Sequence, residues 1–304
     1  MDILGNILYD TVYHSAPIVL CVLGGIFAYK ANVLNIALEG MMLIGAFTST
    51  LCAFLTHNVV LGILLSMVSA LIFGLIFSLM GVTFKGNVII VGLAINLLTS
   101  AIARFVLVTM DTSNITLSFL NVADFQIHIP VIENIPLLGR ILSGHPLITY
   151  ISFIGIFVMW LLMYKTRFGI YVRVVGENED AAKSIGLKTD FYKYAAVLIG
   201  ALCCGLAGAN LSTERLGLFT NDMTAGRGFI AIAAIYCGQG SPTMSSLYAI
   251  LFGLARALSV NLSIYAGPAA GLFDVVPYVI MVCVLTAVSI VKRKNNKIRG
   301  FKNE

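Results

Sequence analysis

The sequence has 304 residues, of which 59% are hydrophobic and only 11% are charged, and its formal net charge is +5. A soluble globular domain carries about 25% charged residues, so this composition excludes an ordinary soluble protein and indicates an integral membrane protein. The positive charge requires no nucleic-acid partner, because the basic tail at 292–304 is typical of a cytoplasmic flank.

Apolar segments of spanning length follow one another along the chain. A membrane-spanning helix needs about 20 apolar residues. The sequence therefore predicts an all-α, polytopic helical bundle that forms a single domain over 1–304. The predicted spans are 7–29, 33–56, 59–82, 87–109, 147–164, 191–211, 243–262 and 273–291.

A shorter apolar segment, 228–238, covers only half of the hydrocarbon core at about 1.5 Å per residue. Lysine and arginine place the loop 165–190 and the tail 292–304 in the cytoplasm, whereas the loop 110–146 has one arginine and is predicted to be external. An external N-terminus then requires an odd number of crossings. We expect about nine, with 228–238 crossing with the help of 218–227.

The external loop contains the stretch DFQIHIPVIENIP at 124–136, in which apolar residues alternate with other residues. This alternation predicts a short strand that ends at a proline, within an ordered external cap. The alternative is a loop that rests on the bilayer surface.

Two predicted helices begin at polar groups inside the apolar sequence. One start has Asn35, Glu39 and Gly40, and the other has Gly226, Arg227 and Gly228. Paired interrupted segments in the two halves of a transporter point to a site at the membrane midplane, and they suggest two pseudo-repeated halves. The candidate pathway residues are Asn35, Glu39, Asn96, Arg227, Phe229, Tyr236 and Gln239.

Each candidate also has a structural interpretation. Glu39 either lines the pathway or holds exposed helix-end N–H groups or an arginine. Asn96 bonds either a solute or a neighbouring helix, and Phe229 and Tyr236 either stack on a base or pack within the bundle. Arg104 and Arg256, near span ends, either reach the interface or form internal ion pairs.

The stretch RVVGENEDAAKSIGLKTD at 173–190 is unusually charged for this chain. Asn178 is a favourable N-cap, Asp180 lies in the first turn, and Gly186 suits the left-handed position after a helix. Such a short helix is unstable alone, so we expect it to dock into a groove on another protein; the alternative is an ordinary surface helix. The predicted docking residues are Glu177, Asn178, Asp180, Ala181, Ala182, Ile185 and Gly186.

Three motifs carry a family resemblance that extends over nearly the whole chain. The pattern RxxG-ENxxAAxxxG at 173–186 resembles the coupling helix of ABC importer permeases of the branched-chain amino acid, ribose and nucleoside superfamily. NVLNIALEGMMLIGAF at 32–47 and GRGFIAIAAIYCGQGSP at 226–242 are similar to early and late signatures of its sugar and nucleoside branch. Within that branch, the chain resembles the shorter permease of a nucleoside importer.

The resemblance implies a bacterial plasma-membrane importer that works by alternating access. It implies three partners: a cytoplasmic ABC ATPase that binds ATP and Mg, a second and homologous permease, and an external substrate-binding lipoprotein. The sequence itself contains no GxxxxGK[ST] loop, so no cofactor is expected on this chain.

Three alternative functions give other interpretations of the same residues. A monosaccharide importer would use the same architecture. A secondary transporter driven by an ion gradient would make Glu39 a proton or sodium site, but it would not explain the charged stretch. An intramembrane enzyme lacks support, because the cysteines match no zinc or redox spacing and no nucleophile–base pattern is present; no catalytic or metal site is predicted.

Overall fold

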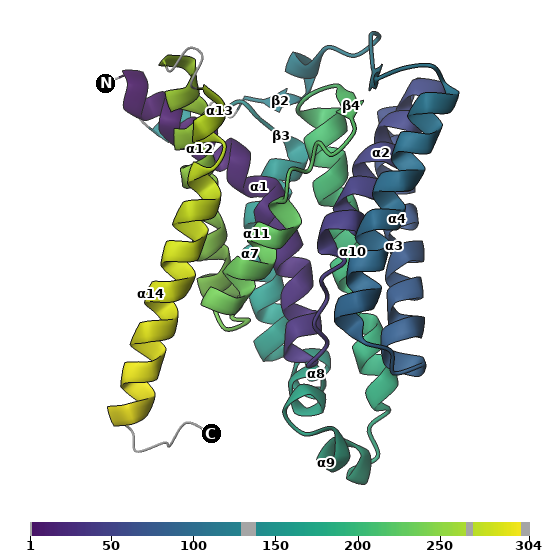
Figure 1. The fold of residues 1–304 in the computed structure, drawn as a ribbon, viewed down its shortest axis with the longest axis vertical. Helices are drawn as coiled ribbons and strands as arrows, with labels where there is room; N and C mark the ends of the chain where they lie inside the picture. The colour runs from purple at the N-terminus through teal and green to yellow at the C-terminus, as the bar shows by residue number, and fades with distance from the viewer. Residues whose placement is uncertain (1, 129–137, 266–269, 299–304) are drawn as a thin grey trace.

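The computed structural model describes residues 2–128, 138–265 and 270–298, and in these ranges the protein is a bundle of long helices (Figure 1). Eight helices in this part of the chain are long and apolar enough to cross a membrane, and one shorter apolar helix accompanies them. The predicted all-α, polytopic membrane fold is confirmed. The spanning elements are α1 (Asp2–Lys30), α2 (Leu38–Thr56), α3 (Val59–Ser78), α4 (Val88–Thr109), α7 (Leu147–Lys165), α10 (Thr189–Ala209), α12 (Pro242–Tyr265) and α14 (Val276–Ile298), with α11 (Arg227–Cys237) as the short helix.

Smaller elements complete the described chain. Two π-helical turns extend α3 and α10, and the helices α8 and α9 lie together at the lower end of the bundle in Figure 1. Their bounds are η1 (Leu79–Thr83), η2 (Val122–Phe125), η3 (Asn210–Glu214), α6 (Leu138–Leu142), α8 (Arg167–Glu177), α9 (Glu179–Ser184), α13 (Ala270–Phe273), β1 (Asn114–Thr116), β2 (Gln126–Ile127), β3 (His145–Pro146) and β4 (Leu218–Thr220).

The core of the bundle is formed by α1, α2 and α10. In their most apolar stretches 83%, 67% and 72% of the residues are buried, whereas only 6% are buried in α14. Glycines allow the central helices to approach closely. A Cβ on Gly24 of α1 would lie 2.7 Å from the Cα of Gly200 on α10, so any larger residue would push these helices apart.

Two helices begin inside the bundle rather than at its ends. The second span was predicted from residue 33, but α2 begins only at Leu38, because residues 33–35 have no regular secondary structure and 36–37 form a turn. α11 is likewise preceded by the non-helical segment 221–226 and lies in the middle of the bundle in Figure 1. Residues 33–37 are buried or half-buried, so protein covers the non-helical backbone there, whereas Asp222 and Ala225 of the second segment are exposed.

The first helix begins at one end of the bundle, and α14 ends at the other end, which it shares with α8 and α9 (Figure 1). This arrangement requires an odd number of passes. Eight helices of the described chain have spanning length, and the ninth pass that the sequence predicted falls on α11, which follows a descending non-helical segment (Figure 1).

Two small antiparallel strand pairs form at the end of the bundle opposite α9. β1 pairs with β4. This pairing joins the loop after α4 to the segment before α11. β2 pairs with β3, which confirms a strand at Gln126–Ile127. The remainder of the predicted strand, from residue 129 onward, lies outside the described residues.

Candidate functional site

The carboxylate of Glu39 joins the two helices that begin inside the bundle. Glu39 is the second residue of α2 and is buried. Its Oε1 accepts a hydrogen bond from the backbone N–H of Gly226 at 2.8 Å, and its Oε2 accepts one from Gly228 at 2.5 Å. The first N–H groups of a helix have no partner within the helix and favour an anion. Glu39 therefore satisfies the free start of α11, which was the structural alternative for this residue.

Glycine is needed at this joint because the two backbones almost touch. A Cβ on Gly228 would lie 2.5 Å from the backbone nitrogen of Glu39. Gly226, the N-cap of α11, has φ of 72°, in the left-handed region. We call the contact of Glu39 with Gly226 and Gly228 the α2–α11 joint.

The start of α2 is held in turn by an amide from α4. Asn96 accepts from the N–H of Gly40 at 2.8 Å and donates to the carbonyl of Ile36 at 3.0 Å. Asn35 accepts from the N–H of Ala37 at 3.0 Å and is buried. Asn96 thus bonds a neighbouring helix, and both amides position the interrupted segment.

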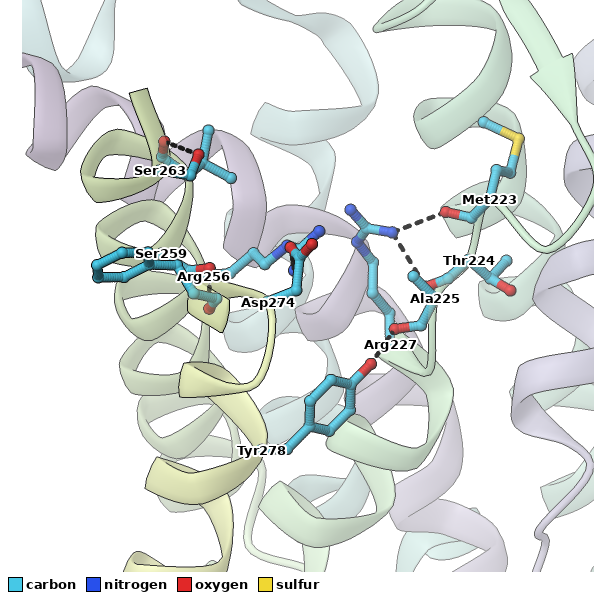
Figure 2. A network of polar contacts seen from close by, with 11 residues as sticks. Met223, Thr224, Ala225, Arg227, Arg256, Ser259, Ser263, Asp274 and Tyr278 are labelled. Atoms are coloured by element: carbon cyan, nitrogen blue, oxygen red, sulfur yellow. Dashed lines mark hydrogen bonds and ion pairs between the residues drawn. The ribbon is translucent and has the colours of Figure 1, made fainter. Parts of the chain in front are cut away.

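Arg227, the other charged residue at the joint, has different partners from those expected. Its Nη1 donates to the carbonyls of Met223 and Thr224, at 2.8 and 3.0 Å, rather than to the Glu39 carboxylate (Figure 2). The hydroxyl of Tyr278 on α14 donates to the carbonyl of Ala225 at 2.6 Å. Hydrogen bonds from Arg227 and Tyr278 therefore hold the segment before α11 in place. Nε of Arg227 is buried without a hydrogen-bond partner.

Both arginines near span ends lie beside a carboxylate, but the pair of Arg104 is exposed rather than internal. Nη1 of Arg256 lies 3.1 Å from Oδ1 of Asp274, as Figure 2 shows. Nη2 of Arg104 lies 4.0 Å from Oδ2 of Asp222, and both side chains are exposed. Asp222 also accepts from the hydroxyl of Ser100 at 3.0 Å, which ties α4 to the segment before α11.

A second buried polar cluster, at the end of α10, includes a residue that sequence reasoning missed. The guanidinium of Arg215 lies 3.4 Å from the ring centroid of Tyr13, and its Nε and Nη1 are buried without partners. The adjacent Glu214 accepts from the N–H of Ile148 and from the amide of Asn210. The sequence alone indicates this site, because the charged pair Glu214 and Arg215 lies just after the predicted apolar span 191–211.

The aromatic candidates lie on one exposed face of α11. Phe229 and Tyr236 are seven residues apart, about two helical turns, and their exposed fractions are 41% and 43%. Tyr236 lines a cavity of about 490 Å³ at the α8 end of the bundle. Gln239 is exposed in the turn after α11, roughly 16 Å along the chain from the joint. The structure therefore does not gather all seven candidates at one point.

The charged stretch between α7 and α10 folds as two helices, α8 and α9. Asn178 caps α9 by accepting from the N–H of Ala181 at 3.0 Å, and Gly186 has φ of 82°, both as predicted. Ala182 is fully buried, whereas Ile185 is 69% exposed. Ile185, the C-cap of α9, is therefore the apolar side chain that faces outward, and Ala182 packs α9 against its own chain.

Glu179 fixes α9 to the start of α10. Its carboxylate lies 2.7 Å from Nζ of Lys183 and 2.5 Å from Nζ of Lys193. Hydrogen bonds from these two ammonium groups lower the pKa of Glu179 to about 2. The carboxylate is therefore fully ionised at neutral pH.

The helix α8 is in close contact with the end of α1. A Cβ on Gly176 would lie 1.9 Å from the carbonyl oxygen of Lys30, so only glycine fits. The chain that follows Lys30 leads directly to the interrupted start of α2 and to Glu39. The close contact of α8 with the end of α1 therefore lies only a few residues from the start of α2.

Within the described ranges, no group of three or more His, Cys, Asp or Glu side chains is placed to hold a metal ion.

Comparison with known proteins gives a consistent result. Residues 7–285 match the family model described as "Branched-chain amino acid transport system / permease component". The guanosine ABC transporter permease protein NupQ of Bacillus subtilis is 32% identical, over 92% of this chain and 88% of NupQ. The nucleoside ABC transporter permease protein NupC of Lactococcus lactis is 30% identical, over 84% of this chain and 82% of NupC.

A third relative is named for a sugar. The putative glucose ABC transporter permease protein TsgC13 of Haloferax volcanii is 29% identical, over 90% of this chain and 84% of TsgC13. No solved structure matches the chain significantly.

Proposed function

Because the chain belongs to the family of permease components of branched-chain amino acid transport systems, we propose that it carries nucleosides into the cell as one subunit of an ATP-driven importer. It is an ABC transporter permease, a transport subunit rather than an enzyme. The names of NupQ and NupC support the nucleoside as substrate. Since these relatives are ABC permeases, the ion-gradient alternative loses its basis.

The α2–α11 joint is the observation that carries the mechanism. Two helices that begin inside the membrane meet through one buried carboxylate and two backbone amides. Hydrogen bonds, unlike a continuous backbone, can break and re-form. The joint therefore allows α2 and α11 to move relative to each other. In the proposed mechanism, the joint is where the bundle changes between outward-open and inward-open forms.

The proposed power stroke enters through α8 and α9. A cytoplasmic ABC ATPase, which binds ATP and Mg, would receive α9 in a surface groove that contacts Ile185, with Glu177, Asp180 and Ala181 beside it. The contact of Gly176 with Lys30 supports this route, because it links α8 directly to the chain that leads to Glu39. The fold of α9 itself depends on its N-cap Asn178, the buried Ala182 and the left-handed Gly186.

The remaining assignments follow from this orientation. The single permease domain, 1–304, lies in the plasma membrane with the N-terminus and the loop 110–146 outside, and with the loop 165–190 and the tail 292–304 in the cytoplasm. Exposed apolar side chains on α3, α4 and α14 leave room for a second, homologous permease as well as for lipid. An external lipoprotein would deliver the substrate.

Uptake by the reconstituted importer tests this function. The permease is reconstituted in proteoliposomes with its ATPase, partner permease and lipoprotein, and uptake of labelled guanosine is measured with internal ATP and with an uncoupler. We expect ATP-dependent uptake that the uncoupler leaves unchanged. Uptake of glucose instead of guanosine would favour the monosaccharide candidate, which the match to TsgC13 supports.

A further inference from the structure

A cavity of about 490 Å³ opens beneath α1 and beside α8, at the end of the bundle assigned above to the cytoplasm. This volume lies within the range of small-molecule sites, about 300–1,000 Å³. Three tyrosines from three helices line it: Tyr29 of α1, Tyr164 of α7 and Tyr236 of α11. We call it the tyrosine cavity.

The side chains of the tyrosine cavity combine aromatic rings with charged groups. The rings of Tyr29 and Tyr236 meet edge to face, with centroids 5.2 Å apart. The guanidinium of Arg173 lies 5.0 Å from the ring centroid of Tyr164, and its Nε is buried without a hydrogen-bond partner. Lys30, Asn32 and Glu177 add further polar side chains to the lining. The cavity thus offers ring surfaces, unused donors and one carboxylate acceptor.

This combination matches the chemistry of a nucleoside. A base has flat faces that stack on aromatic side chains, and its carbonyl and ring-nitrogen acceptors bind arginine donors. Its amino and ring N–H groups, like the ribose hydroxyls, are donors that a carboxylate can accept. The charged side chains of the lining are two cations, Lys30 and Arg173, and one anion, Glu177, so the cavity offers both donors and an acceptor to a polar solute.

The cavity and the α2–α11 joint lie along the same helix, α11. α11 begins at the α2–α11 joint, and its exposed face carries Phe229 near the joint and Tyr236 two turns further on, in the cavity. On the opposite wall, Arg173 and Glu177 belong to α8, the helix that leads into α9. A solute that leaves the joint along α11 therefore arrives next to the segment that the ATPase would move.

We infer that the tyrosine cavity is an inner binding site for the transported nucleoside, occupied after the bundle opens towards the cytoplasm. This inference rests on the proposed nucleoside function and adds a second binding position on the exit side. Tyr29, Tyr164 and Tyr236 supply the stacking surfaces, and Arg173 is the donor that selects bases with an exposed acceptor.

Photolabelling of the complete importer in inside-out vesicles tests the site. The probe is 8-azidoguanosine, which then meets the cytoplasmic face first, and labelled peptides are mapped by mass spectrometry. We expect labelling next to Tyr29, Tyr164 or Tyr236 that excess guanosine prevents and excess glucose does not. In Tyr236→Leu and in Arg173→Gln, roughly tenfold more guanosine should be needed for the same protection, because one stacking or paired contact is lost.

Matched variants separate a binding role from a folding role. Tyr171→Leu changes a tyrosine of α8 that packs on Tyr192 and does not line the cavity, so it should leave protection unchanged. Arg173→Lys keeps the charge but removes the planar donor, so it should weaken protection less than Arg173→Gln does. Each variant is first shown to co-purify with the other subunits.

Each other outcome overturns the inference. Labelling outside the cavity, or labelling that guanosine does not compete, excludes an inner nucleoside site. An anionic phospholipid that co-purifies with the wild type, is lost in Arg173→Gln and resists guanosine would make the cavity a lipid-headgroup site, a common use of tyrosines and basic residues at membrane interfaces. Guanosine uptake in right-side-out vesicles is measured in parallel. If uptake is present, the failure concerns the inner site alone; if it is absent, the proposed substrate fails too.

Discussion

Glu39 and Gly228 are 189 positions apart in the sequence, yet the carboxylate oxygen of one lies 2.5 Å from the backbone nitrogen of the other. This hydrogen bond joins a helix of the first half of the chain to a helix of the second half. Its partner bond to Gly226 makes Glu39 an acceptor for two amides of the same helix start. A buried carboxylate tolerates this depth because both oxygens are occupied.

The first prediction concerns the acceptor capacity of Glu39. Glu39→Gln keeps one acceptor oxygen and should retain part of the uptake. Glu39→Leu leaves two buried N–H groups without a partner, at a cost of about 1–3 kcal/mol each, and should abolish most uptake. ATP-dependent guanosine uptake by reconstituted importers measures both. Equal loss in the two variants, together with uncoupler-sensitive wild-type uptake, would instead indicate a proton carrier.

The second prediction concerns Asn96. Asn96→Leu removes the partners of the Gly40 N–H and the Ile36 carbonyl, and should destabilise the permease by about 1–3 kcal/mol per group. Thermal unfolding in detergent measures the change. Asn58→Ala is the control, because it removes an exposed N-cap of α3 and should cost only about 1 kcal/mol. An Asn96→Leu variant as stable as wild type would contradict the bridging role.

The third prediction concerns the exposed apolar residue of α9. Ile185→Glu should lower co-purification of the ATPase at least about fivefold, because loss of a central apolar contact costs more than about 1 kcal/mol. Leu216→Glu introduces the same charge at the opposite end of the bundle, where the residue is 46% exposed, and should have no effect. Normal ATPase binding by Ile185→Glu would remove α9 from the interface. Ala182 is not suited to this test. It is fully buried, so a larger residue there would disrupt the packing of α9 itself.

The fourth prediction is a pH dependence. The pKa of Glu179 is lowered from 4.5 to about 2 by Lys183 and Lys193, so the ionised carboxylate stabilises the folded loop at pH values above 4.5. This stabilisation should be lost as the pH falls from 4.5 towards 2. Because 36% of the Glu179 side chain is exposed to solvent, the difference between wild type and Glu179→Gln at pH 7 should stay below about 1 kcal/mol and decrease with salt. Thermal unfolding at pH 7 and pH 3 measures it; a difference that grows at pH 3 would contradict the assignment.

The fifth prediction concerns the contact between α8 and α1. Gly176→Ala places a Cβ 1.9 Å from the Lys30 carbonyl oxygen, so α8 must shift away from α1. We expect ATP hydrolysis to continue while uptake falls, because the displaced α8 no longer moves the chain leading to the joint. Gly271→Ala is the control, since a Cβ there has no neighbour within 4 Å. Unchanged coupling in Gly176→Ala would show that force does not pass through this contact.

The sequence by itself determined the membrane fold and the local caps. Apolar length sets the spans, because the hydrocarbon core has a fixed thickness. Asn178 and Gly186 took their predicted positions for a local reason, since a cap depends only on the residues within one turn of it.

Tertiary structure decided the partners of the polar groups inside the bundle. The residues alone left open whether Glu39 bonds an arginine, a helix start or a solute, because its partners lie in the other half of the chain. The same holds for Ala182, whose short side chain suits either a docking surface or a packed position. The extended start of α2 and the tyrosine cavity also arise from contacts between distant segments, which no local pattern encodes.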